Sequence, residues 1–254
     1  MEVSQILKIY NMQKTQYCIK IQNLSKSYCN KPILKNISFS VKKGTIHGFI
    51  GPNGAGKSTT LKALMGLVIH NKGKIYIEDQ EDKSKFNIGY ARAEPKFPDC
   101  KVEQIVVDCV TFLNLSLKNK KQSISLNWVK QQLSKSLLNK YRQQKFSSLS
   151  TGWKKTLQLF ILTLYKPKIL ILDEPFNGLD ATFHVWLIES LKEARQKGCS
   201  ILLSTHTLSD LQELADEITI IKQGQVVYTG PKTVNIQKTY QELFLQKREN
   251  YLSF

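Results

Sequence analysis

The sequence predicts an α/β fold, in which helices cover a mainly parallel β-sheet and a helical lobe is inserted at about 95–150. The first observation is the alternation of short apolar runs with segments of helical spacing after residue 167, which is typical of strand–helix–strand units. The second is the change of character over residues 102–145, where helical spacing dominates. The 254 residues, 41% of them hydrophobic, suffice for one large domain with a packed core.

The elements follow one another in a regular order. Residues 1–16 are expected to form a loosely attached leader, and Met12 offers a second possible start of translation. β-rich runs predict strands at 17–23, 33–41, 45–50, 74–79, 86–92, 168–173, 200–206, 217–224 and 225–230. Helical spacing predicts helices at 57–69, 102–115, 126–138, 151–165, 182–196 and 208–216, and residues 235–254 are expected to form a short helical tail.

Composition excludes several classes of protein. The longest apolar runs are far shorter than the roughly 20 residues that a membrane-spanning helix needs, and no signal-peptide pattern opens the chain. The cysteines at positions 18, 29, 100, 109 and 199 have neither metal-ligand spacing nor the density of a disulfide scaffold. We therefore expect a cytosolic protein with reduced thiols.

The formal net charge of +17 favours polyanionic partners such as nucleotide, nucleic acid or anionic lipid. An alternative is a lysine-biased composition spread over a solvated surface. The distribution is uneven, because no Asp or Glu occurs between Asp108 and Asp173, a segment that contains twelve Lys and Arg residues. Such a lobe of one sign suggests a negative surface nearby.

The segment "GPNGAGKST" at residues 51–59 matches the phosphate-binding loop pattern and stands between an apolar strand and a helix. Its glycines let the backbone N–H groups point at phosphate oxygens, Lys57 adds a cation, and the Ser58 hydroxyl can ligate Mg²⁺. Thr59 and Ala55 are better explained by packing and fit than by chemistry. The candidate nucleotide-binding residues of this segment are Gly51, Asn53, Gly54, Gly56, Lys57, Ser58 and Thr59.

A metal-bound triphosphate also needs a carboxylate, and "KILILDEP" supplies two at the end of an apolar strand. There Asp173 can face Mg²⁺ while Glu174 reaches the attacking water. The alternative, an acidic turn before Pro175, is improbable beside a phosphate-binding loop.

The segment "LSTGW" at residues 149–153 precedes an apolar helical stretch. Ser150 is a good helix cap, and these letters alone favour that interpretation. A helix N-terminus also offers N–H donors and partial positive charge, so the same geometry can hold a phosphate.

The order and spacing of "GPNGAGKST", "LSTGW", "KILILDEP", "NGLD" and "STH" resemble those of the nucleotide-binding subunit of an ATP-binding-cassette (ABC) transporter, from about residue 17 to 230. The resemblance implies a RecA-like P-loop NTPase core at 17–234. It also implies a small antiparallel β subdomain and an α-helical subdomain inserted at about 95–158. ATP and Mg²⁺ would be the cofactors, and two such chains, identical or different, would form a dimer.

The resemblance also assigns roles to single residues. Glu174 would be the general base for water, and His206 of "STH" the switch histidine that contacts the γ-phosphate. Asp180 of "NGLD" would lie at the dimer interface. The Ser150 hydroxyl and the amides near Gly152 would face a γ-phosphate held by the opposing chain.

Physical arguments support part of this assignment. His206 follows an apolar strand, which places it at the carboxyl end of the sheet, where α/β proteins bind ligands. Tyr28 matches the aromatic residue that stacks on adenine, a contact worth roughly 1–3 kcal/mol in comparable settings. For His47, His70 and His184 a structural role is expected.

The sequence departs from the family pattern at two places. Counting from Gly89, Ala93 stands where the family has a glutamine that touches Mg²⁺ and water. We expect Glu94 to replace it as a metal contact after a one-residue shift, and the alternative is a site that has lost this contact. In "LSTGW", Thr151 and Trp153 replace the usual Gly and Gln. Burial in the core is the expected use of the Trp153 indole, with the dimer or permease interface as the alternative.

These observations favour an ATPase subunit that powers a separately encoded membrane permease, for export, as a peripheral protein on the cytoplasmic face of the membrane. The alternative is a soluble ABC ATPase with cytosolic partners, of the iron–sulfur cluster assembly type. Nucleic acid is not expected as a partner, since the sequence contains neither a coiled-coil insertion nor a second cassette.

Overall fold

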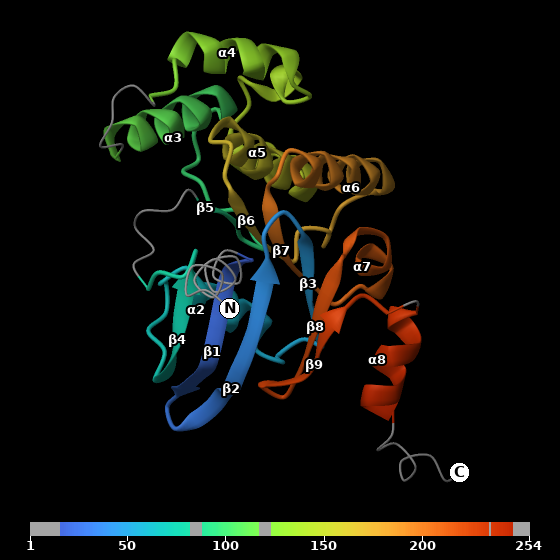
Figure 1. The fold of residues 1–254 in the computed structure, drawn as a ribbon. Helices are drawn as coiled ribbons and strands as arrows, with labels where there is room; N and C mark the ends of the chain where they lie inside the picture. The colour runs from blue at the N-terminus through green and yellow to red at the C-terminus, as the bar shows by residue number, and fades with distance from the viewer. Residues whose placement is uncertain (1–15, 82–87, 117–122, 234, 246–254) are drawn as a thin grey trace, which may run out of the picture.

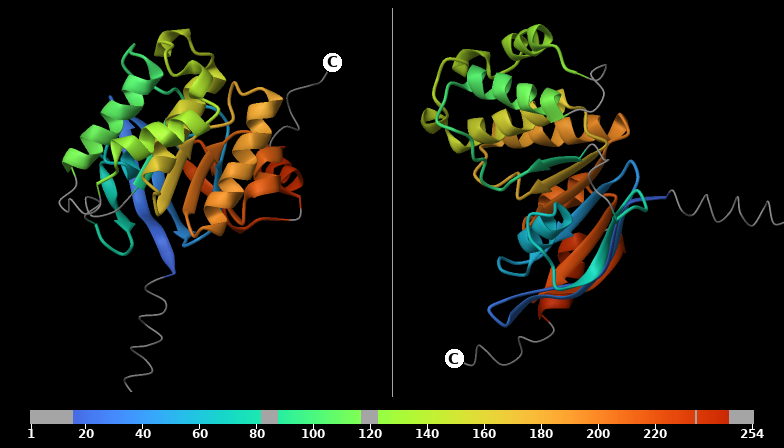
Figure 2. Two further views of the ribbon diagram at one scale, coloured as in Figure 1. Left: turned by 90° about the horizontal axis from the view of Figure 1, so that it is seen from above. Right: turned by 90° about the vertical axis from the view of Figure 1, so that its left-hand side faces the viewer.

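The computed structural model describes residues 16–81, 88–116, 123–233 and 235–245, and Figure 1 shows how they are arranged. Two sheets form the body of the molecule, and a lobe of helices lies at one end of it (Figure 2). The predicted leader lies outside the described residues except for Gln16.

The smaller sheet is antiparallel, with the strand order β2-β1-β4. Cys29 and Asn30 join its first two strands in a tight turn, and both have positive φ angles, of 44° and 63°, as two-residue hairpin loops require. This sheet confirms the antiparallel β subdomain, although its first strand runs past the predicted end at residue 23. Its members are β1 (Tyr17–Tyr28), β2 (Lys31–Lys42) and β4 (Lys72–Ile77).

The larger sheet has the order β5-β6-β7-β3-β8-β9. All neighbours are parallel except β9, which is antiparallel to β8. Strands β3, β6 and β7 are buried along their whole length, which explains why the sequence shows them as mainly apolar runs without a regular polar alternation. The members are β3 (Ile46–Ile50), β5 (Ile88–Ala91), β6 (Ile169–Asp173), β7 (Ser200–Thr205), β8 (Glu217–Lys222) and β9 (Gln225–Pro231).

Helices cover the large sheet and build the lobe. The lobe contains α3 (Val102–Ser116), α4 (Leu126–Lys135) and two short 3₁₀ turns, η2 (Asn139–Tyr141) and η3 (Phe146–Ser148). The other helices among the described residues are α2 (Lys57–Leu64), α5 (Thr151–Leu164), α6 (Ala181–Gln196), α7 (Leu208–Leu214) and α8 (Ile236–Leu245).

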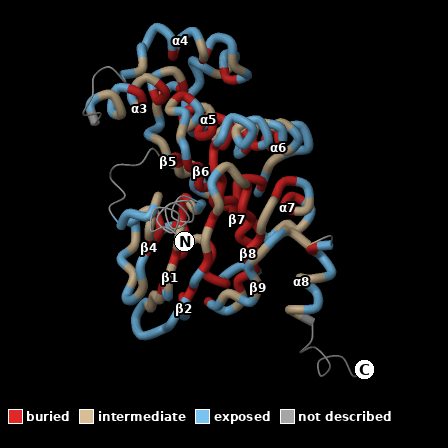
Figure 3. The backbone as a smooth tube through the Cα atoms, in the orientation of Figure 1, coloured by how far each residue is buried: buried red, intermediate tan, exposed pale blue. Residues whose placement is uncertain are grey.

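The described residues form three hydrophobic cores (Figure 3). The first lies between the two sheets and includes α2, the second lies between the large sheet and the helices α5 to α8, and the third fills the lobe. Helix α5 contributes to two cores, through Leu159 to the second and through Leu157 and Ile161 to the third. It therefore joins the lobe to the sheet.

Helices α2, α4 and α7 end earlier than the sequence predicts. Helix α2 ends at Leu64 because Gly66, with φ of 71°, adopts the left-handed conformation that stops a helix. The predicted tail contains α8, which packs on the second core through the fully buried Ile236, while Lys222 Nζ donates to the Leu243 carbonyl over 3.0 Å. Within the described ranges, no helix combines the length and apolarity that a bilayer crossing requires.

Candidate nucleotide-binding and hydrolysis site

The strand order of the large sheet creates the site. Strands β6, β7 and β3 are parallel neighbours, so their carboxyl ends meet at one edge of the sheet. The register pairs Asp173 with Ser204 and Ile50 with Thr205. The phosphate-binding loop after β3, the carboxylates after β6 and His206 after β7 are thus brought together from distant parts of the sequence.

The phosphate-binding loop is tightly packed at its start. A Cβ atom on Gly51 would lie 2.3 Å from the Ile221 carbonyl oxygen, so only glycine fits there without a shift of the backbone. Lys57 is 5% exposed, and its Nζ donates to the carbonyl oxygens of Gly51 over 2.7 Å and Pro52 over 3.3 Å. Gly54 and Gly56 have φ angles of 79° and 110°, whereas Asn53 is exposed and Thr59 half-buried.

Ser58 and Asp173 lie side by side. The Ser58 hydroxyl donates to Asp173 Oδ1 over 3.0 Å, and the buried Ser204 hydroxyl donates to the same oxygen over 2.8 Å. A hydroxyl and a carboxylate at this edge are the hard oxygen ligands that Mg²⁺ prefers. The residues present therefore fit the predicted metal.

The carboxylate of Glu174 lies between two cationic or titratable groups. Its Oε1 is 3.1 Å from Lys57 Nζ, and its Oε2 is 2.9 Å from His206 Nδ1. The side chain of His206 is 42% exposed, whereas Glu174 is buried. Glu174 also has a φ of 49°, and its amide donates to the carbonyl and hydroxyl oxygens of Ser204 over 3.1 and 3.2 Å. A left-handed conformation at a non-glycine residue marks a place where the surroundings hold the backbone.

The signature segment, which we define as residues 149–153, begins α5 as predicted. The Ser150 hydroxyl caps the helix by accepting from the Trp153 amide over 3.4 Å, and Ser150 is exposed. Gly152 is buried, and a Cβ atom there would lie 3.1 Å from the Phe183 ring. In the described part of the chain, no hydrogen bond joins Ser150 to the phosphate-binding loop. The helix cap is thus confirmed, and the role toward a phosphate stays a prediction.

Two further candidates are exposed at the ends of elements. Asp180 caps α6, its Oδ1 accepting from the Phe183 amide over 3.0 Å. Tyr28 ends β1 with 45% of its surface exposed, and Lys26 Nζ lies 4.8 Å from the centre of its ring. Both positions leave the side chains accessible to a ligand or a partner.

The loop after β5 holds the expected glutamine replacement. Glu94 is exposed and makes no hydrogen bond or ion pair with the residues that the structure describes, so its role as a metal contact stays a prediction. Helix α5 holds the backbone of this loop through Gln158. With its side-chain amide oriented so that both atoms are paired, Gln158 accepts from the Arg92 N–H over 3.0 Å and donates to the Arg92 carbonyl over 3.1 Å.

Trp153 is not simply buried in the core, as the sequence led us to expect, but half-buried in a row of rings. Its ring lies 4.3 Å from that of Tyr141 and 4.7 Å from that of Phe183, centre to centre, and Lys140 Nζ lies 5.0 Å above it. An indole on the first turn of α5 contacts both the lobe and α6, and these contacts account for the part of it that is buried.

Sequence reasoning missed Ser204 and Lys155. Ser204 had a signal, since it is a hydroxyl residue inside an apolar strand. Lys155 had none, because it is one of many lysines in its segment, yet it is 4% exposed and contacts the backbone just after β6. The other histidines have structural partners: His47 Nε2 is 2.8 Å from Thr219 Oγ1, His70 Nε2 is 3.2 Å from the Gly73 carbonyl, and His184 Nε2 is 2.8 Å from Asp210 Oδ1.

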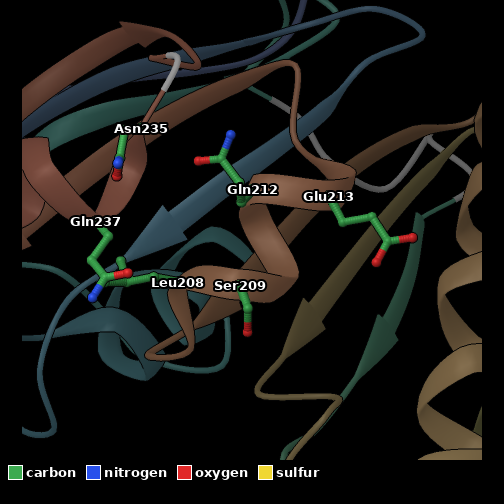
Figure 4. A pocket seen from close by; sticks show the side chains of 6 residues that line it. All are labelled: Leu208, Ser209, Gln212, Glu213, Asn235 and Gln237. Atoms are coloured by element: carbon green, nitrogen blue, oxygen red, sulfur yellow. The ribbon is translucent and has the colours of Figure 1, made fainter.

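A polar pocket of about 490 Å³ lies between α7 and the start of α8 (Figure 4). It is lined by Leu208, Ser209, Gln212, Glu213, Asn235 and Gln237. None of these residues belongs to the predicted site, so this pocket is separate from the phosphate-binding edge of the sheet.

The parallel sheet, the phosphate-binding loop and the carboxylates after β6 define the class of protein, a P-loop nucleoside triphosphatase. Residues 34–177 match the ABC transporter family. The lantibiotic transport ATP-binding protein SrtF of Streptococcus pyogenes is 34% identical, over 91% of this chain and 100% of its own length. The linearmycin resistance ATP-binding protein LnrL of Bacillus subtilis is 32% identical, over 85% of this chain and 70% of its own length.

A solved structure of the ATP-binding subunit of an ABC transporter has a TM-score of 0.76 and 25% identity, and it covers 89% of this chain and 99% of its own. The chain therefore belongs to the ABC transporter family. It is an ATP-binding and ATP-hydrolysing subunit with the RecA-like fold of that family.

Proposed function

We propose that the chain hydrolyses ATP to power a separately encoded membrane permease, and that the direction of transport is export. The observation that carries the proposal is the meeting of Lys57, Glu174 and His206 beside the Ser58–Asp173 pair. Export is supported by SrtF and LnrL, whose names record lantibiotic transport and linearmycin resistance.

The chemistry follows from the side chains at the edge of the sheet. Ser58 and Asp173 would hold Mg²⁺, which supplies positive charge next to a triphosphate when it is bound. Glu174 accepts the proton of the attacking water, since its carboxylate is held by His206 and lies beside the lysine that binds the phosphates. The amides of the phosphate-binding loop and Lys57 bind the phosphates, and Tyr28 stacks on the adenine.

A second subunit would complete the site. Ser150 and Asp180 are exposed at the starts of α5 and α6, where the described residues of their own chain place no phosphate-binding group against them. A helix N-terminus favours a bound anion. We infer that Ser150 and the amides near Gly152 contact the γ-phosphate held by the opposing chain, in a homodimer or a heterodimer.

A groove on the lobe is the proposed contact with the permease. It has a volume of about 530 Å³ and lies between the loop after β5 and the helices α3 and α5. Its lining is mostly apolar and includes Phe97, Tyr165 and Phe112, of which Phe112 is 75% exposed. Exposed apolar surface of this kind is typical of protein–protein contacts, and we propose that a cytoplasmic segment of the permease occupies it, with the chain held at the inner face of the membrane.

The dimer is tested with Glu174→Gln, which removes the general base and should trap an ATP-dependent dimer. Ser150→Arg should abolish that dimer while monomeric ATP binding is largely kept, because Ser150 lies outside the phosphate-binding loop of its own chain. Both are measured by light scattering with and without ATP. A Glu174→Gln protein that stays monomeric with ATP, alone and with its permease, would contradict the sandwich arrangement.

The permease is tested by fractionation. The protein should sediment with membranes only when the permease is co-expressed, and its ATPase rate should then depend on that complex. Stable cytosolic complexes in place of membrane association would favour the soluble ATPase instead. Salt-sensitive binding to duplex DNA with ATPase stimulation would favour a nucleic-acid partner, which the proposal does not expect.

A further inference from the structure

We propose that Lys155 is the positioning residue for Glu174: it holds the backbone of the general base from the signature helix α5. The proposal rests on the proposed role of Glu174 in hydrolysis. It concerns a buried lysine that the phosphate-binding machinery described above does not include.

The contacts of Lys155 use its whole ammonium group. Nζ donates to the carbonyl oxygens of Glu174 over 2.9 Å, Pro175 over 3.1 Å and Asn177 over 2.5 Å. A lysine ammonium has three donors and no acceptor, so these three bonds satisfy it completely. Because the side chain is 4% exposed, water does not replace these contacts. The lysine therefore fixes the turn that follows β6.

The turn needs such a fixation. Glu174 has a φ of 49°, and a non-glycine residue held in this region costs of order 1–3 kcal/mol unless its surroundings determine the conformation. Its amide is bound by Ser204 on the adjacent strand β7, and its carbonyl is bound by Lys155. The backbone is thus held on both sides, which directs the carboxylate toward Lys57 and His206.

The same helix makes further contacts with this region. The Trp153 ring packs edge-on against Phe183, and the Gly152 backbone approaches the same ring. Gly178, in the segment that leads to α6, lies next to the Thr151 side chain, because a Cβ atom there would be 3.2 Å from Thr151 Cγ2. The start of α5 and the segment after β6 therefore pack as one unit. If Ser150 contacts nucleotide on an opposing chain, Lys155 links that contact to the general base of its own chain.

Charge makes the contact sensitive to pH. Burial lowers the pKa of Lys155 to about 8, against the opposing effect of the negative Glu174 and Asp173. Lys57 on α2 and His206 after β7 bind the carboxylate of the same Glu174. A neutral amine has one donor fewer, so deprotonation above about pH 8 would release one of the three carbonyls.

The experiment compares Lys155→Met, Lys155→Arg and the control Lys154→Met. Lys154 is the neighbouring lysine on α5, and its ammonium lies 5.2 Å from the centre of the Phe146 ring. We expect Lys155→Met to lower kcat by about 10- to 100-fold, since a displacement of roughly 1 Å in a catalytic group can cost that much, with KM for ATP within about twofold. Lys154→Met should leave both constants unchanged.

Lys155→Arg tests the charge, because a guanidinium does not deprotonate in this range. It should recover part of kcat, and it should not show the decline of kcat above about pH 8 that we expect of the native chain. An unchanged kcat in Lys155→Met, or an equal loss in Lys154→Met, overturns the proposal. If thermal unfolding shows that the Lys155→Met protein does not fold, the comparison uses Lys155→Gln, which keeps a hydrogen-bond donor.

A double substitution separates positioning from general damage. If Lys155 acts through Glu174, adding Lys155→Met to Glu174→Gln should lower the residual ATPase rate by less than about twofold, because effects of groups that act as one unit are not additive. A full further loss of 10- to 100-fold would overturn the proposal. Failure of Glu174→Gln itself to reduce hydrolysis would contradict the proposed role of Glu174, and this outcome is distinguishable from the others.

Discussion

Ser204 offers a sharp test of how the sheet would prepare the proposed metal site. Its buried hydroxyl donates to Asp173 Oδ1 over 2.8 Å, and its oxygen also accepts from the Glu174 amide over 3.2 Å. Ser204→Ala removes both contacts at once. The Glu174 amide keeps the Ser204 carbonyl at 3.1 Å, so the principal loss is the hydrogen bond to the carboxylate.

The magnitude follows from the charge of the acceptor. A hydrogen bond to a charged group contributes about 1.5–3 kcal/mol, and removing a group that supports a metal ligand costs about 10- to 100-fold in metal affinity or activity. We therefore expect Ser204→Ala to lower the free energy of unfolding by about 1.5–3 kcal/mol. The Mg²⁺ concentration that gives half-maximal ATPase activity should rise at least tenfold, as roughly expected for a lost metal-supporting contact.

The control is Ser200→Ala on the same strand. The Ser200 hydroxyl accepts from the Gly44 amide over 2.9 Å, a contact between neutral groups at the opposite end of β7. It should cost about 0.5–1.5 kcal/mol and leave the Mg²⁺ requirement unchanged. The assays are urea unfolding and ATPase rates over a Mg²⁺ titration. Equal losses of stability in the two variants, or an unchanged Mg²⁺ requirement in Ser204→Ala, would refute the reasoning.

Two more predictions concern pH and packing. Two neighbours, His47 and Lys42, lower the pKa of Glu217 from 4.5 to about 2. Lys42 Nζ makes the closer contact, at 2.6 Å from the carboxylate, whereas His47 Nδ1 is 3.8 Å away. The contribution of this carboxylate to the free energy of unfolding is present above pH 4.5 and is lost as the pH falls through about 2. Glu217→Gln should therefore weaken the fall of the free energy of unfolding at acid pH. An unchanged fall would contradict the contribution of Glu217. Gly51→Ala places a Cβ 2.3 Å from the Ile221 carbonyl and should weaken ATP binding by at least about tenfold in a titration. The Cβ of Gly54→Ala meets nothing within 4 Å, and this variant carries only the backbone strain of its φ of 79°. It should therefore lose less, and an equal loss would count against crowding as the cause.

The sequence predicts the layout of the site because that layout depends on local patterns. An apolar strand, a glycine loop and a helix start define the position of Lys57, and an apolar strand with two terminal acids defines that of Asp173 and Glu174. Their approach to one another also follows, since parallel strands present their carboxyl ends at one edge. The antiparallel subdomain was expected from the family resemblance, and the structure confirms it.

The supporting contacts could not be predicted in the same way. Lys155 binds carbonyl groups of a turn about twenty residues further along the chain, and backbone acceptors carry no sequence signal. The ring contacts of Trp153 depend on how α5 packs against Tyr141 and Phe183, which lie on separate elements. Gly66 could have predicted the end of α2, but the apolar residues on both sides of it led us to extend the helix to residue 69.

The contacts of Lys57 indicate how nucleotide binding and hydrolysis are connected. Its three donors are directed to the carbonyls of Gly51 and Pro52 and to the carboxylate of Glu174. Contact with a phosphate requires Lys57 to give up one of these partners. A phosphate is an anion, as the Glu174 carboxylate is. Replacing that carboxylate with a phosphate therefore changes the charge around the Lys57 ammonium less than replacing a carbonyl would. Glu174 would then keep His206 and the backbone contacts to Ser204 and Lys155, and its Oε1 would become available for the proposed role of accepting a proton from water. On the proposed function, the same lysine that binds the substrate would release the base.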